Sequence, residues 1–176
     1  MTSRSTEPQT AESAYQYALR LLTGRDYTSA RLLGKLSGRG VCELDAEATL
    51  VRLQNEGWLN DRRYAVRFAE AALADARFYG PRLRQEMRRR GFEAGLVDDV
   101  LGGLQEYLDE GAGIRAILER RYPDFRFPAA TDRDKRRIIG YLQRRGYGLS
   151  AIIQALKAAQ HDQEYIFTYK LRGSNK

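Results

Sequence analysis

The sequence has little of the chemistry that enzymes and metal sites use. Its 176 residues include one cysteine, Cys42, and one histidine, His161. A single cysteine permits no internal disulfide, which is typical of proteins from a reducing cytoplasm. A single histidine excludes the HExxH motif and leaves no cluster with metal-ligand spacing. The sequence therefore predicts neither a metal site nor a catalytic cysteine.

Phosphate-binding loops are missing as well. Gly34-Lys35 lacks the upstream glycine of a P-loop, and Gly38-x-Gly40 has neither a third glycine nor a preceding strand. No serine, histidine and acid stand at a spacing typical of a catalytic triad. Carboxylate pairs such as Asp98-Asp99 lie in a helical segment that is acidic throughout, which favours a solvated face. We predict a protein that is not an enzyme and uses no cofactor.

Long hydrophobic runs are also absent. The mean hydropathy is −0.59, which excludes a membrane span. Residues 1–10 are polar and lack the apolar core of a signal peptide. Hydrophobic residues still make up 43% of the chain, enough to bury a core. We expect a cytoplasmic protein with no membrane association.

A short sequence motif recurs three times in the chain. Each copy has an arginine, an apolar residue, a Leu or Met four residues later, then Arg-Gly and a further apolar residue. The copies are Arg31, Leu32, Leu36, Arg39, Gly40, Val41; Arg82, Leu83, Met87, Arg90, Gly91, Phe92; and Arg137, Ile138, Leu142, Arg145, Gly146, Tyr147. The glycines lie 51 and 55 residues apart, a period that indicates stacked helical units.

The apolar spacings indicate three helices in each unit. Apolar residues recur six and ten residues after each glycine, on one face of a following helix. The glycine itself fits the position after a helix end, where φ is positive. Another amphipathic segment precedes each copy, with Asn60 and Thr131 or Asp132 as candidate N-caps. Almost nothing alternates with period two, apart from Tyr165, Phe167 and Tyr169 in the tail.

The predicted fold is therefore all-α, an elongated right-angled or curved array of three tandem three-helix repeats. The repeats cover residues 12–59, 60–110 and 111–162, with tails at 1–11 and 163–176. The buried positions are expected to be Leu32, Leu36, Leu50, Leu83, Met87, Val97, Leu101, Ile138, Leu142, Ile152 and Leu156. We also place Tyr15, Trp58, Tyr64, Phe68 and Phe92 in or beside the core.

Charge is distributed unevenly among the predicted helices. The chain has 30 Lys and Arg against 23 Asp and Glu, for a net charge of +7. Residues 77–91 hold six arginines and one glutamate, whereas residues 92–110 hold six acids and no base. Residues 133–145 are again basic. The middle helix of each repeat is therefore basic, and the last helix tends to be acidic.

The basic helices predict a binding surface. The arginine before each glycine suits a helix C-terminus, where the helix dipole favours a cation, and i,i+4 pairs such as Arg82 with Glu86 explain others. Arginines opposite the apolar stripes are not explained in this way, and stacked guanidinium groups match phosphates or carboxylates. The candidate binding residues are Arg31, Lys35, Arg82, Arg89, Arg133, Arg137 and Arg144. The arginines among them are expected to form one discontinuous track.

The motifs resemble those of the RecX family of bacterial recombinase regulators. The resemblance rests on AYQYALRLLTGRDYTSARLLGKLSGRG, LQNEGWLNDRRYAVRFAEA and YGPRLRQEMRRRGF, and covers about residues 13–160. Its most specific parts are the run Gly57 to Asp61 with Tyr64-Ala65, and Gly80-Pro81. Met87 replaces the usual leucine, a volume-conserving change. The third repeat is looser at the loop of residues 125–128, and the tail is longer than usual.

The resemblance implies a regulatory protein of DNA recombination, DNA repair and the SOS response. Such a protein binds the RecA filament on DNA, lodges in its helical groove, and inhibits recombinase, ATPase and coprotease activities. We expect a monomer. Two alternatives stay open: a direct DNA-binding helical module that competes for single strands, and a scaffold that binds only proteins through its acidic helices. Salt dependence separates them, because binding to phosphates weakens steeply as salt rises.

Overall fold

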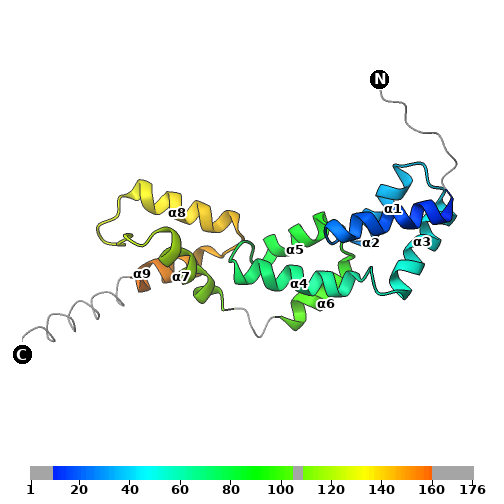
Figure 1. The fold of residues 1–176 in the computed structure, drawn as a ribbon. Coiled ribbons are helices and arrows are strands. Elements are labelled where there is room, and N and C mark those ends of the chain that lie inside the picture. Colours follow the sequence, from blue (N-terminus) through cyan, green and yellow to red (C-terminus); the bar gives the residue numbers. More distant parts are fainter. Residues whose placement is uncertain (1–9, 105–108, 160–176) are drawn as a thin grey trace, which may run out of the picture. The chain divides into compact units, whose positions relative to one another are not determined.

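The computed structural model describes residues 10–104 and 109–159, and in those ranges the protein is built from helices without strands (Figure 1). This confirms the predicted all-α class. The helices are α1 Ala11–Gly24, α2 Ser29–Ser37, α3 Glu43–Asn55, α4 Asp61–Ala74, α5 Gly80–Arg89, α6 Ala94–Gly103, α7 Glu110–Arg121, α8 Asp132–Arg144 and α9 Leu149–Ala158. The weak alternation around Phe167 lies outside the described residues.

Short polar side chains start several helices. The Asn60 Oδ1 atom accepts from the Arg63 N–H at 2.8 Å, and Thr131 Oγ1 accepts from the Asp134 N–H at 3.2 Å. The predicted cap Asn60 is thereby confirmed, and of the two candidates Thr131 and Asp132 the structure has Thr131 as the cap. Thr28 caps α2 in the same way, and its side chain is fully buried. These side chains satisfy N–H groups that have no partner within the helix.

The three Arg-Gly turns have one conformation. Gly40, Gly91 and Gly146 have φ of 88°, 88° and 102°. The residue after each glycine donates its N–H to the carbonyl five positions back, at 3.2 to 3.3 Å, and each glycine donates three positions back at 2.9 Å. This is the Schellman pattern of helix ends. The two positions whose apolar contact accompanies this pattern are buried in all three turns: Leu36 and Val41, Met87 and Phe92, and Leu142 and Tyr147.

The chain divides into two compact units. Unit 1 comprises residues 1–68 and 87–100, and unit 2 comprises residues 69–86 and 101–176. The division falls inside α4, α5 and α6. The second predicted repeat therefore contributes residues to both compact units.

In unit 1, α1, α2 and α3 pack around one apolar cluster (Figure 1). Its fully buried members include Leu32, Leu36 and Leu53. A polar network closes the surface between α1 and α3. Tyr15 donates its hydroxyl to the Glu56 carboxylate, and the Arg52 guanidinium lies 3.6 Å from the centre of the Tyr15 ring.

In unit 2, α7 and α8 pack with α9 around a second cluster that includes Ile114, Ile138 and Ile152. The Tyr147 ring stacks on the Tyr79 ring, with centroids 4.9 Å apart and planes inclined by 12°. Burial raises the pKa of the Tyr147 hydroxyl to about 12, although nearby Arg145 opposes this rise. Tyr147 is therefore neutral at physiological pH.

The predicted core is confirmed with one exception among the aromatic residues. All eleven apolar positions expected to be buried have exposed fractions of 9% or less. The prediction that Trp58 lies in or beside the core is wrong, because 53% of its surface is exposed. Gly57 has a φ of 77° and ends α3. The chain then turns so that Leu59, 2% exposed, enters the core instead.

Each later Arg-Gly turn meets the start of an earlier middle helix. In unit 1, Thr28 Oγ1 donates to the Arg90 carbonyl at 3.0 Å. In unit 2, the Tyr79 N–H donates to the Arg145 carbonyl at 2.8 Å. Thr28 and Tyr79 both lie twelve residues before their own repeat's glycine. At two successive junctions, the end of one repeat's middle helix is thus hydrogen-bonded to the start of the preceding repeat's middle helix.

Candidate partner-binding surface

Two candidate binding residues lie on the exposed face of α2. Arg31 and Lys35 are exposed, whereas Leu32 and Leu36 on the other face are fully buried. One Arg31 nitrogen, Nη2, donates to the Arg89 carbonyl at 3.0 Å. This hydrogen bond gives Arg31 a structural role near the start of α2, which the sequence alone did not provide. Neither Arg31 nor Lys35 has an ion pair with another described residue.

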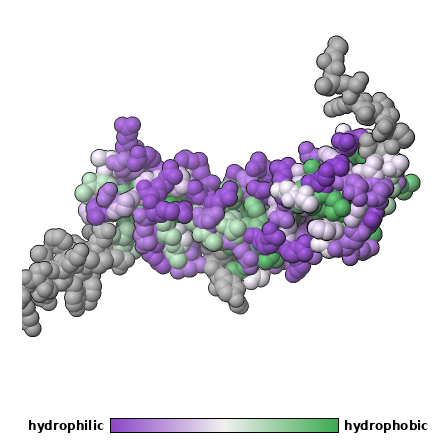
Figure 2. Space-filling model, viewed as in Figure 1, coloured by the Kyte–Doolittle hydropathy of each residue, from purple (hydrophilic) through white to green (hydrophobic). Residues whose placement is uncertain are grey.

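Three candidate residues form a row on α8. Arg133, Arg137 and Arg144 are exposed, and their spacings of four and seven residues place them on one side of the helix. Ile138 and Leu142 are buried on the opposite side. Arg137 lies 3.6 Å from Asp134 in an exposed pair, which holds an arginine only weakly. Hydrophilic residues dominate the surface over α8 in Figure 2.

The arginines of α5 have different environments. Arg89 is exposed. Arg82 makes the i,i+4 pair with Glu86 that the sequence predicted, since it donates to Glu86 Oε1 at 2.8 Å, and it also donates to Gln85 at 2.8 Å. Its side chain is 39% exposed and that of Glu86 is 3% exposed. The predicted pair of Arg82 with Glu86 is therefore confirmed, and it engages part of this guanidinium group within the helix.

The arginine before each glycine stacks on an aromatic ring. Arg39 lies 4.5 Å from the Tyr17 ring centre, Arg90 lies 4.4 Å from Phe68, and Arg145 lies 4.6 Å from Tyr141. The sequence explained these arginines only by helix dipoles. Tyr17 and Phe68 each precede the following Arg-Gly glycine by 23 residues. That shared spacing is a signal that would have predicted the cation–π contact in the first two repeats.

The described residues contain no grouping of three or more histidine, cysteine or acidic side chains able to hold a metal ion. Within the same ranges, no helix combines the length and apolar character needed to cross a bilayer. Cys42 is exposed at the start of α3 and makes no side-chain cap. The described helix faces offer cationic groups.

Comparisons with known proteins give a consistent result. Residues 14–53 match the family model "RecX, first three-helix domain". Regulatory protein RecX of Trichlorobacter lovleyi is 46% identical over 140 residues, which cover 80% of this chain and 91% of that protein. Regulatory protein RecX of Thermus thermophilus is 37% identical over 152 residues, covering 86% and 95%.

Solved structures agree on the fold. The crystal structure of RecX from Lactobacillus salivarius superposes with a TM-score of 0.66 at 19% identity, over 84% of this chain and 97% of that one. A second crystal structure, of a regulatory protein RecX, has a TM-score of 0.63 at 21% identity, covering 82% and 72%. The identity and coverage of the sequence relatives, together with the repeated helices, show that this chain belongs to the RecX family of regulatory proteins.

Proposed function

We propose that this protein binds the RecA nucleoprotein filament and inhibits its recombinase, ATPase and coprotease activities. The observation that carries the proposal is the 46% identity to a regulatory protein RecX along 91% of that relative. The partner itself comes from the resemblance of the motifs to this family. Through this inhibition the protein modulates recombination and DNA repair in the cytoplasm.

The basic helix faces support this function. Arg31 and Lys35 on α2, and the row of Arg133, Arg137 and Arg144 on α8, present cations without a strong acidic partner among the described residues. A nucleoprotein filament carries phosphates and carboxylates in a regular arrangement. Several weak contacts along such a surface reinforce one another, because the first raises the effective concentration of the next.

Co-sedimentation tests the proposal directly. RecA is assembled on single-stranded DNA with a nucleotide, and the protein is spun down with the filaments or with the same DNA alone at equal salt. We expect sedimentation with the filament and a fall in RecA ATPase activity as the protein is added. Equal sedimentation with naked DNA and no effect on ATPase would contradict the proposal.

Direct competition for single-stranded DNA is the second candidate, favoured by the excess of arginine and a pI of 9.7. In that case binding to naked DNA is strong, and its logarithm falls linearly with the logarithm of the salt concentration. Inhibition is then relieved by adding DNA. Under the filament proposal, by contrast, added naked DNA leaves inhibition largely unchanged.

A further inference from the structure

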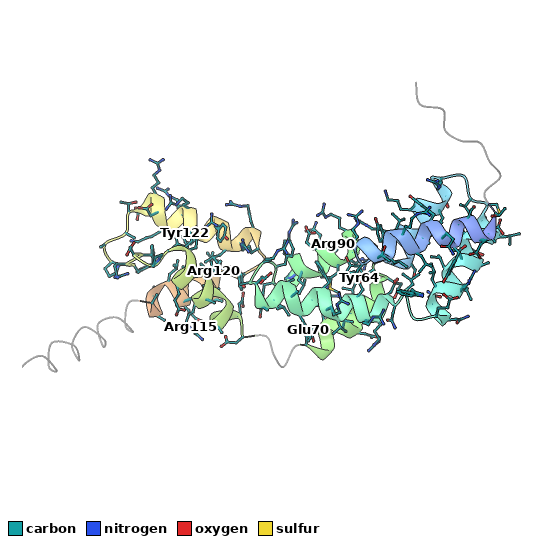
Figure 3. All side chains as sticks on the ribbon, in the orientation of Figure 1. Tyr64, Glu70, Arg90, Arg115, Arg120 and Tyr122 are labelled. Carbon is teal, nitrogen blue, oxygen red and sulfur yellow. The ribbon has the colours of Figure 1, made fainter. Side chains whose placement is uncertain are left out.

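A polar cavity lies at the junction between the first two predicted repeats, inside unit 1. Its volume is about 270 Å³, several times the roughly 30 Å³ that one water occupies in the liquid. Its walls include Arg25, Asp26, Tyr27, Arg31, Tyr64 and Arg90. Tyr64 and Arg90 lie beside each other in Figure 3. The wall residues come from the loop after α1, from α2, from α4, and from the end of α5.

The three arginines of this cavity retain hydrogen-bonding capacity. Arg25 donates from Nε to the Tyr27 hydroxyl at 2.9 Å, which leaves its two terminal nitrogens for other groups. Arg31 uses one terminal nitrogen for the Arg89 carbonyl. The Arg90 Nε is buried and has no hydrogen-bond partner.

The nearby carboxylates are already engaged. Asp26, in the cavity wall, pairs with Arg67 at 2.9 Å. Asp61 accepts the Ser29 N–H at 2.9 Å and the Ser29 hydroxyl at 3.1 Å, at the start of α2. The Arg90 guanidinium is held by the Phe68 ring at 4.4 Å, and the Tyr64 ring packs on Phe92 at 4.9 Å. The cavity therefore carries more positive than negative charge, and packing holds the Arg90 and Tyr64 side chains in its wall.

We propose that this cavity binds a phosphate group. A guanidinium group matches two oxygens of a phosphate, and three guanidinium groups from separate segments offer more donors than the two oxygens of a carboxylate satisfy. The volume accommodates a phosphate together with part of an attached ester. The phosphate is either free or part of a nucleic-acid backbone. This inference does not depend on binding to RecA.

Calorimetric titration of the full chain with inorganic phosphate, against chloride of equal ionic strength, tests the site. Arg25→Gln is the diagnostic variant because Arg25 is exposed in a loop and its removal opens no core cavity. Arg20→Gln makes the same charge change on the exposed face of α1. We expect equal binding by the parent and Arg20→Gln, and about tenfold weaker binding by Arg25→Gln, as for the loss of one charge-assisted hydrogen bond.

A short single-stranded oligonucleotide identifies the source of the phosphate. If the oligonucleotide displaces inorganic phosphate and itself binds less tightly to Arg25→Gln, the site takes a nucleic-acid phosphate. If phosphate binds and the oligonucleotide does not compete, the ligand is a free phosphate. No binding of phosphate beyond the chloride control, or equal losses in both variants, would overturn the site. RecA is absent throughout, so failure here is separate from failure of the filament proposal.

Discussion

The three repeated glycines share a backbone conformation but have different neighbours. A methyl group on Gly40 would meet nothing within 4 Å. On Gly91 it would lie 2.9 Å from Thr28 Oγ1, and on Gly146 it would overlap the Tyr79 carbonyl and lie 2.7 Å from Arg82 Cβ. Positive φ alone explains the first glycine. The other two are also required by the close approach of another segment.

Alanine substitutions separate these two requirements. Gly40→Ala should cost about 1 kcal/mol, the penalty for a side chain in the left-handed region. Gly146→Ala should cost a further 1–3 kcal/mol, roughly, because the methyl group also forces the backbone of Tyr79 to move. Equilibrium denaturation in urea measures both changes. Equal free energies of unfolding for the two variants would contradict the close packing at Gly146.

Acid should weaken unit 1 through Glu56. The Tyr15 hydroxyl, followed by Arg52, lowers the pKa of the Glu56 carboxyl below its ordinary 4.5. A lowered folded pKa gives stability that is complete above 4.5 and is lost as the pH falls through the folded value. Thermal melting from neutral to acid pH should show a smaller loss for Glu56→Gln than for the parent. Glu47→Gln, an exposed position on the same helix, should melt like the parent at each pH.

At the scale of the helix, Thr28 has two roles and Thr131 has one. Thr28 Oγ1 accepts from the Arg31 N–H at 3.3 Å and donates to the Arg90 carbonyl at 3.0 Å. Thr131 Oγ1 caps α8 by accepting from the Asp134 N–H. The sequence offered Thr131 or Asp132 as the cap, because one of them begins the amphipathic segment that follows the aromatic loop. The sequence analysis did not single out Thr28 as a cap. Its second bond was not predictable from local spacing, because the Arg90 carbonyl lies 62 residues away.

The extra role of Thr28 should be measurable. Thr131→Ala is expected to cost about 1 kcal/mol of stability, the usual value for an N-cap. Thr28→Ala should cost about 2 kcal/mol, because the Arg90 carbonyl also loses its donor. Thr28→Ser keeps the hydroxyl and should recover most of the loss. If serine is as destabilising as alanine, packing of the threonine methyl group is the cause rather than the hydrogen bonds.

Helices and core were predictable from the sequence because their signals are local. The spacing of Leu32, Leu36 and Gly40 predicts both the buried face of α2 and the position where this helix ends. The corresponding residues predict the same features in the other repeats. Contacts between repeats are not local. How the helices pack against one another cannot be predicted from the periodicity of one helix. This packing produces the cation–π contact of Arg90 with Phe68, the burial of Glu86 and the cavity around Arg25.

At the scale of the whole molecule, the basic track is a proposal that charge reversals can test. Arg82 is unsuitable for such a test, because a glutamate there would face the buried carboxylate of Glu86. The pair Arg133→Glu with Arg144→Glu changes only exposed positions of α8. We expect this variant to lose most inhibition of RecA ATPase while its melting temperature stays close to the parent's, since surface charges contribute little to folding.

A charge-matched control uses exposed arginines outside the middle helices. Arg20→Glu with Arg62→Glu changes the net charge equally, on α1 and α4. This control should inhibit RecA as the parent does. If both double variants lose inhibition equally, total charge matters rather than the faces of α2, α5 and α8. If neither loses it, the acidic helix around Asp99 becomes the better candidate surface.

The repeated junction also has a consequence for folding during synthesis on the ribosome. The Thr28 hydroxyl donates to the carbonyl of Arg90, which is synthesised 62 residues later. The Arg145 side chain donates to the Ala76 carbonyl, which precedes it by 69 residues. Synthesis proceeds from the N-terminus, and early segments fold first. The first and second predicted repeats therefore each leave their junction open until the middle helix of the following repeat has emerged. A translational pause between two repeats would expose that open junction to chaperones and proteases.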